Sequence, residues 1–183
     1  MEEFSTCWAE EEHPYLMALP DAPGYSSEEK PFCAKADAEI LAQVLNSYDR
    51  ETEDFYRWTV EYGRDEVSEL IARKSGVDIG RLVSLVALER GLSGRIFKLE
   101  VTGSLKTLVL GKELEIRRLL SESHLKSSAF HATFKEDSVI LEGKGWGHGV
   151  GLCQIGAAVM ASKGYSYTEI LEHYYPGTTI NEN

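Results

Sequence analysis

The chain has 183 residues, of which 43% are apolar, and a formal net charge of −11. This length and composition allow an ordinary hydrophobic core and so exclude global disorder, while the acidic balance argues against a broad basic face for nucleic-acid phosphates. The longest apolar run, 82–88, is too short to span a bilayer, and the acidic opening residues lack the pattern of a signal peptide.

Residues 1–34 predict an irregular, acidic lead-in. Prolines interrupt this stretch repeatedly, and only 15–19 is apolar enough to form an edge strand laid on the body. From residue 35 onwards, apolar residues recur with helical spacing or alternate as in strands. The predicted order is a helix over 34–48, a strand over 55–62, a helix over 65–74, strands over 82–88, 95–101 and 104–110, a helix over 112–120, and a hairpin of 129–134 with 138–142.

The last forty residues predict a glycine-rich loop, helices over about 152–162 and 168–174, and a short terminal strand. Strands and helices are mixed without a regular βαβ alternation. This order favours an α+β fold with a mainly antiparallel sheet, several short helices, and a glycine-rich loop that leads into a C-terminal helix pair. We therefore expect two parts, the lead-in 1–34 and a domain over 35–183.

The three cysteines, Cys7, Cys33 and Cys153, have no CxxC spacing, which excludes a zinc-ribbon site. In an exported protein Cys7 and Cys33 could pair across a loop, whereas Cys153 is predicted to be a buried free thiol near the start of a helix. The spacing of the histidines and cysteines indicates no metal site, so no metal and no other cofactor is expected; zinc held by Cys7 or Cys33 with His13 would contradict this.

Five glycines alternate with other residues over 143–151 and flank Trp146 and His148. Glycine loses the most backbone entropy on folding, so such a run indicates positive φ angles or a backbone that lies directly against another group. The spacing matches neither a phosphate-binding loop nor a dinucleotide fingerprint. An indole beside a titratable imidazole suits a sugar ring and a hydrogen-bonding or proton-handling group. The alternative is that both rings belong to the core.

The glycine-rich stretch and the residues that follow it also resemble a known protein family. The run GWGHGVGLCQIGA at 145–157, with YSY at 165–167 and ILEHYYPGT at 170–178, resembles the C-terminal signature of the SpoIID/LytB family, that of stage II sporulation protein D and the amidase enhancer LytB. Further upstream, RGLSGR at 90–95, LKSSAF at 125–130, and Trp8 followed by PYL at 14–16 also resemble the family. The resemblance therefore covers nearly the whole chain.

This resemblance implies a role in bacterial peptidoglycan and an extracytoplasmic location in the cell envelope or outside the cell. Sporulation protein D is a lytic transglycosylase of glycan strands, a reaction that needs a carboxyl group to protonate the leaving oxygen. The family's catalytic glutamate and its zinc-associated stretch precede the Pro-Tyr-Leu segment, so we expect this chain to be a C-terminal portion of the domain, or a divergent form whose other half is missing or separate. No catalytic residue is assigned, since none of the acids in 2–12 matches that motif, and whether the chain is itself an enzyme stays open.

Two functions then compete with the possibility of a structural remnant. The first is glycan-strand binding and remodelling of the lytic-transglycosylase type. The second is a non-catalytic module that enhances a separate N-acetylmuramoyl-L-alanine amidase, and the missing acid favours it for this chain alone. The expected partners are glycan strands, and an amidase or an upstream half of the domain; neither nucleic acid nor a membrane span is expected.

We expect one substrate-binding groove in which His148 orients the substrate or an acid supplied from elsewhere. Arg95 would hold a carboxylate or a hydroxyl pair, and Gln154 would lie on the first helical turn, whose N–H groups can bind an acetamido or acidic substituent. The alternative for Arg95 and Gln154 is that they tie the glycine-rich loop to the turn at 91–94. The complete predicted set is Ser93, Arg95, Trp146, His148, Gln154 and Tyr174, with Tyr175 at the rim.

Overall fold

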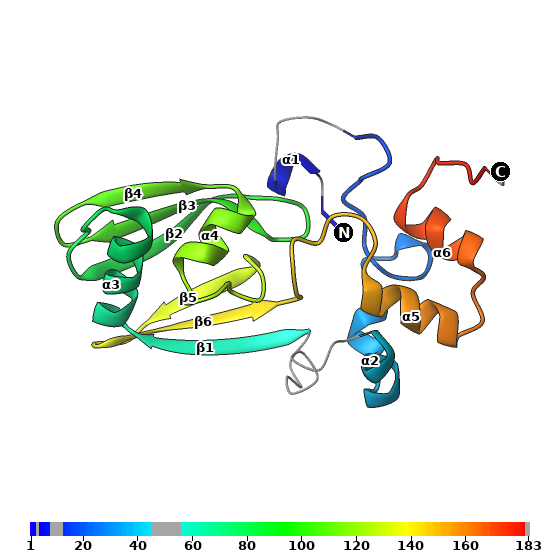
Figure 1. The fold of residues 1–183 in the computed structure, drawn as a ribbon, viewed down its shortest axis with the longest axis horizontal. Coiled ribbons are helices and arrows are strands. Elements are labelled where there is room, and N and C mark those ends of the chain that lie inside the picture. Colours follow the sequence, from blue (N-terminus) through cyan, green and yellow to red (C-terminus); the bar gives the residue numbers. More distant parts are fainter. Residues whose placement is uncertain (3, 8–12, 45–55, 182–183) are drawn as a thin grey trace.

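Two three-stranded antiparallel sheets are formed by the alternating segments in the middle of the chain (Figure 1). The computed structural model describes residues 1–2, 4–7, 13–44 and 56–181. One sheet has the order β1 (Arg57–Gly63), β6 (Ser138–Lys144), β5 (Phe130–Phe134), and the other has the order β2 (Leu82–Arg90), β3 (Ile96–Gly103), β4 (Thr107–Gly111).

The sheets enclose the main core together with helices α3 (Arg64–Ser75) and α4 (Glu113–Leu119). Leu141 of β6 lies opposite Val60 on one side and Ala132 on the other, so apolar residues meet across the sheet. α3 ends at Gly76, which adopts the left-handed conformation (φ 74°) that glycine tolerates best. We call this part the sheet region; its buried core consists of Trp58, Val67, Ile71, Ile79, Leu82, Ile96, Leu99, Val101, Leu110, Ile116, Leu119, Leu120, Leu125, Phe130, Val139 and Leu141.

A smaller core joins the beginning of the chain to its end, and we call this part the helical region. It contains the 3₁₀ helices η1 (Pro23–Tyr25) and η2 (Phe32–Lys35), and the helices α2 (Ala38–Val44), α5 (Gln154–Ser162) and α6 (Tyr167–Tyr174). Figure 1 shows the blue N-terminal segments beside the orange and red C-terminal helices. The buried residues of this core are Phe32, Val159, Met160 and Tyr174.

The glycine-rich loop runs from β6 to α5 and connects the two regions (Figure 1). The first residues of the chain lie along it, because the Glu2 N–H donates to the Gly149 carbonyl at 2.8 Å and Glu2 forms a parallel bridge with Val150. The short helix α1 (Phe4–Cys7) follows and packs near α4. Residues far apart in sequence therefore shape this loop.

The predicted α+β class with a mainly antiparallel sheet is confirmed. Two predicted strands are wrong. Residues 15–19 form a turn and extended chain without a ladder, and 175–181 form no strand because the C-terminus follows α6 away from both sheets (Figure 1). The helix predicted over 34–48 begins only at Ala38, and its last four residues lie outside the described part. None of the described helices is long and apolar enough to cross a membrane.

Candidate functional site

The glycine-rich loop begins one glycine later than the sequence pattern predicts. Gly143 belongs to β6 and pairs with Trp58 of β1, and a Cβ atom at this position would overlap the indole ring. Gly143 is therefore a packing residue within a strand. The other four glycines, at 145, 147, 149 and 151, all have positive φ, between 69° and 80°, so the chain turns repeatedly between the two regions.

Arg95 is buried beneath this loop. Its Nε donates to the Gly147 carbonyl at 3.1 Å, and a Cβ atom at Gly149 would lie only 2.5 Å from the guanidinium carbon. The loop backbone therefore wraps around the guanidinium, an approach that a side chain at position 149 would block. Burial lowers the pKa of Arg95 from its ordinary value, and the negative charges of Glu113 and Glu2 oppose this shift.

The carboxylate of Glu2 completes a buried chain of hydrogen bonds with Ser93 and Arg95. Its Oε2 accepts from the Ser93 hydroxyl at 2.6 Å and from the Ser93 N–H at 3.1 Å. Arg95 Nη1 in turn donates to the Ser93 Oγ at 3.0 Å. Glu2 is only 1% exposed, and a Cβ atom at Gly91 would overlap its carboxylate. We call these three residues the Glu2–Ser93–Arg95 chain.

The glycine-rich loop, which the Glu2–Ser93–Arg95 chain holds, presents two rings to solvent. Trp146 is 38% exposed, and the ammonium of Lys126 lies 5.5 Å from its ring centroid, within cation–π range. His148 is also exposed, and its Nδ1 accepts the Val150 N–H at 3.1 Å, which favours the tautomer with the proton on Nε2. Burial of part of the ring and the nearby guanidinium groups of Arg95 and Arg117 lower the pKa of His148, against the opposing charge of Glu113. The imidazole is therefore mostly neutral at pH 7.

Sequence reasoning missed a second buried carboxylate, Glu113, at the start of α4. Its Oε2 lies 3.4 Å from Arg117 Nη1, while its Oε1 is buried with no hydrogen-bond partner among the described residues. The charge of Glu113 acts on Arg95, His148 and Cys7. The helical spacing of Glu113, Ile116 and Leu120 was the available signal, because it places this acid on the inward face of α4.

Cys7 also contacts the glycine-rich loop. It makes no disulfide, since all three cysteines are free thiols. Its Sγ lies 3.6 Å from the His148 carbonyl. Burial raises the pKa of Cys7 from 9.0 to about 12, so this thiol stays neutral at ordinary pH. The Cys7–Cys33 pairing that the sequence left open is therefore not formed.

The structure brings together part of the predicted set. Ser93, Arg95 and His148 meet at the loop, and the Arg95 contacts match the tying role that the sequence analysis gave as its alternative. Trp146 and Gln154 are exposed, on the loop and at the first position of α5.

The two tyrosines at the end of α6 lie elsewhere. Tyr174 is 1% exposed in the core of the helical region and donates to Asp21 Oδ1 at 2.9 Å, so it does not line the surface of the loop. The Tyr175 hydroxyl accepts the Leu152 N–H at 3.4 Å, and its ring approaches Gly151, at the far end of the loop. Sequence reasoning placed Tyr174 wrongly because its partner Asp21 comes from the lead-in.

Comparison with known proteins gives partial but specific matches. Stage II sporulation protein D of Bacillus amyloliquefaciens is 39% identical over 75 residues, which are 41% of this chain and 22% of that protein. The amidase enhancer of Bacillus subtilis (strain 168) is 43% identical over 68 residues, 36% of this chain and 9% of that protein. The chain thus spans less than a quarter of the length of these relatives. Their names support the resemblance to the SpoIID/LytB family.

A family model matches a larger part of the chain, residues 2–151, which include both sheets, the Glu2–Ser93–Arg95 chain and the glycine-rich loop. Because this match extends over most of the sequence, the chain belongs to the family described as a domain of unknown function (DUF8618).

Proposed function

We propose that this chain takes part in remodelling the bacterial cell wall outside the cytoplasm, by binding peptidoglycan glycan strands at the glycine-rich loop. The observation that carries the proposal is the loop itself, which exposes Trp146 and His148 while the Glu2–Ser93–Arg95 chain holds its backbone from beneath. The names of the two relatives, a sporulation protein and an amidase enhancer, support the cell-wall context.

The surface has the chemistry that a glycan strand requires. An exposed indole can stack on the apolar face of a sugar ring, and a neutral imidazole can exchange hydrogen bonds with hydroxyl or acetamido groups. The Lys126 ammonium beside Trp146 can pair with the lactyl carboxylate of a muramic acid residue from which the peptide has been removed. We therefore propose denuded glycan strands as the preferred ligand.

Binding, rather than cleavage by this chain alone, is the function that the buried acids support. Glu2 and Glu113 are each 1% exposed. Glu2 is bound to Ser93, and Glu113 lies beside Arg117. The buried carboxylates of Glu2 and Glu113 act on the loop through Arg95 and His148. A substrate bound at the surface would not bring its glycosidic oxygen within reach of either carboxylate. We propose that they position the loop.

A second candidate function is the enhancement of a separate amidase. It is favoured by the 43% identity to the amidase enhancer of Bacillus subtilis. In this case the same loop would hold the glycan strand while the amidase removes the peptide, so glycan binding is common to both candidates.

The test is co-sedimentation of the purified chain with insoluble denuded glycan strands. We expect Trp146→Ala to weaken binding about tenfold, equivalent to ~1.4 kcal/mol. Tyr167→Phe and Tyr167→Ala are matched controls, since Tyr167 is an exposed aromatic residue on α6, and they should bind like the unmodified chain. Equal binding by Trp146→Ala would refute the assignment of the surface.

The supernatants separate the candidate functions. Anhydromuramyl products, detected by mass spectrometry, would show cleavage by the chain itself and contradict the binding role. In a separate incubation with peptidoglycan that still carries its stem peptides, faster release of peptides by a purified amidase when the chain is present would favour the enhancer role.

A further inference from the structure

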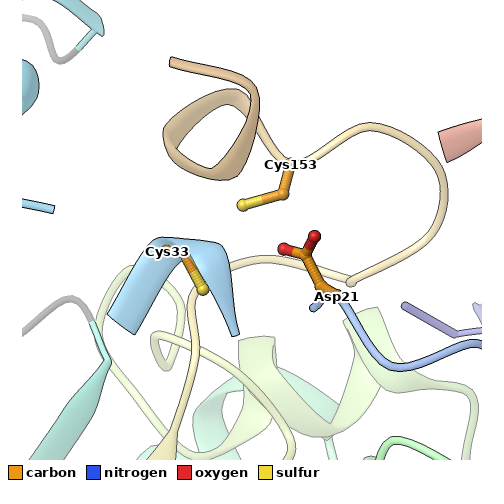
Figure 2. Close-up of side chains that lie close together, drawn as sticks. All are labelled: Asp21, Cys33 and Cys153. Carbon is orange, nitrogen blue, oxygen red and sulfur yellow. The ribbon is translucent and has the colours of Figure 1, made fainter. Parts of the chain in front are cut away.

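A second cluster of reactive side chains lies in the helical region, apart from the glycan-binding surface. It contains Asp21, which precedes η1, Cys33 of η2, and Cys153, the N-cap residue of α5. One ligand atom from each residue lies within 4.8 Å of the other two. Figure 2 shows the three side chains around one space, with the Cys153 sulfur and the Asp21 carboxylate directed into it.

The carboxylate of Asp21 is fixed in place by its neighbours. It is only 8% exposed, and its Oδ1 receives the Tyr174 hydroxyl at 2.9 Å and lies 3.1 Å from His173 Nε2. Hydrogen bonds of this kind typically orient the ligands of a metal site from behind. They also leave Asp21 with lone pairs that can face the two cysteines.

The Cys153 sulfur is suited to act as a thiolate ligand, and the Cys33 sulfur lies beside it. The Cys153 Sγ accepts the Gly156 N–H at 3.4 Å, and the N-terminus of a helix stabilises a thiolate. A buried carboxylate beside a thiolate needs a compensating positive charge.

We propose that Cys33, Cys153 and Asp21 bind a zinc ion. Two thiolates and one carboxylate provide three of the four ligands of a tetrahedral zinc site, and soft sulfur ligands select zinc over magnesium or calcium. Water completes the coordination. Two cysteines alone would suit a disulfide equally well, but the oriented carboxylate beside them favours the metal. Sequence spacing gave no sign of the site because Cys153 lies 120 residues after Cys33.

The test is a metal titration of the full chain after reduction and removal of bound metal with a chelator. We expect one zinc ion per chain. Cobalt(II) used as a probe should give the near-ultraviolet charge-transfer absorption of bound thiolates. Cys33→Ser and Cys153→Ser should lose this absorption and bind zinc at least a hundredfold more weakly, and Asp21→Asn at least tenfold more weakly. Zinc should raise the melting temperature of the unmodified chain and leave that of Cys33→Ser unchanged.

Matched controls keep the experiment decisive. Cys7→Ser removes a cysteine that lies at the glycine-rich loop and should bind zinc like the unmodified chain. Cys153→Ser retains a good N-cap residue for α5, so loss of binding would not reflect loss of the helix. The proposal is overturned if the reduced chain binds no stoichiometric zinc, if Cys33→Ser binds it normally, or if peptide mapping finds a Cys33–Cys153 disulfide and reduction does not restore zinc binding.

Discussion

The sheet region and the helical region are stabilised in different ways. In the sheet region, neighbouring segments pair as β2–β3, β3–β4 and β5–β6, and a large apolar core fills the space between the sheets and α3 and α4. In the helical region, residues near the start of the chain meet residues near its end over four buried apolar side chains and a polar group around Asp21. A small core depends more heavily on each polar contact, because burial of apolar surface contributes less to its stability.

The largest expected effect is on the core of the sheet region. Leu99 of β3 is fully buried, so Leu99→Ala leaves a cavity and should lower the free energy of unfolding by about 2–5 kcal/mol. Urea denaturation followed by circular dichroism measures this loss. Val109→Ala, at an exposed position on the neighbouring strand β4, is the control and should change stability by less than about 0.5 kcal/mol. Similar losses for the two variants would show that the sheet core does not dominate the stability of the chain.

The next effect is on the loop that joins the regions. Gly149→Ala forces a side chain into a left-handed conformation and against Arg95, and should cost about 2–3 kcal/mol. Gly177→Ala has the same backbone strain with open space around the new methyl group, and should cost about 1 kcal/mol. Thermal denaturation of both variants gives the difference. Equal costs would mean that the loop does not need to lie against the guanidinium.

A smaller effect should be confined to the helical region. Tyr174→Phe removes the hydroxyl that donates to Asp21 and should cost about 1–2 kcal/mol. Hydrogen exchange followed by mass spectrometry should show faster exchange in α5 and α6, with β2 and β3 unchanged. Tyr167→Phe, at an exposed position, should leave exchange unaltered. If exchange instead quickens across both sheets, the two regions unfold as one unit.

The smallest effect concerns the pH dependence of the loop. The pKa of His148 is lowered below its ordinary value of 6.5, so the folded chain favours the neutral ring. The stabilisation that this provides is present above pH 6.5 and is lost as the pH falls toward the folded pKa. NMR titration of the imidazole should give a midpoint below 6.5, and His148→Gln should flatten the decline in stability between pH 6.5 and 5. A midpoint above 6.5 would contradict the burial described here.

The contrast between the regions also explains what could be predicted from the sequence. The elements of the sheet region followed from local periodicity; β2, for example, begins at Leu82 as predicted and ends two residues beyond the predicted Leu88. The helix α3, Arg64–Ser75, followed in the same way from the pattern over 65–74. The helical region was harder, because the partners of Phe32 and Asp21 lie more than a hundred residues away.

The same difference between local patterns and distant contacts decides which residues of the candidate site could be predicted from the sequence. The alternating glycines identified the loop, and the turn at 91–94 placed Ser93 and Arg95. Periodicity cannot show that Glu2 reaches Ser93, because 91 residues separate them. It also cannot show that Tyr174 turns inward, since an aromatic residue at the end of a helix suits either a groove or a core.

The Glu2–Ser93–Arg95 chain has an evolutionary consequence. Because Gly91 leaves room for the carboxylate and Gly149 leaves room for the guanidinium, these two glycines and the three residues of the Glu2–Ser93–Arg95 chain are five positions that accept change only together. A homologue that replaces Glu2 with a neutral residue should therefore also alter Ser93 or Arg95, and one with a larger residue at position 91 should lack the acid. Covariation among these positions across natural sequences would indicate that homologues maintain the contact between the first residues and the glycine-rich loop.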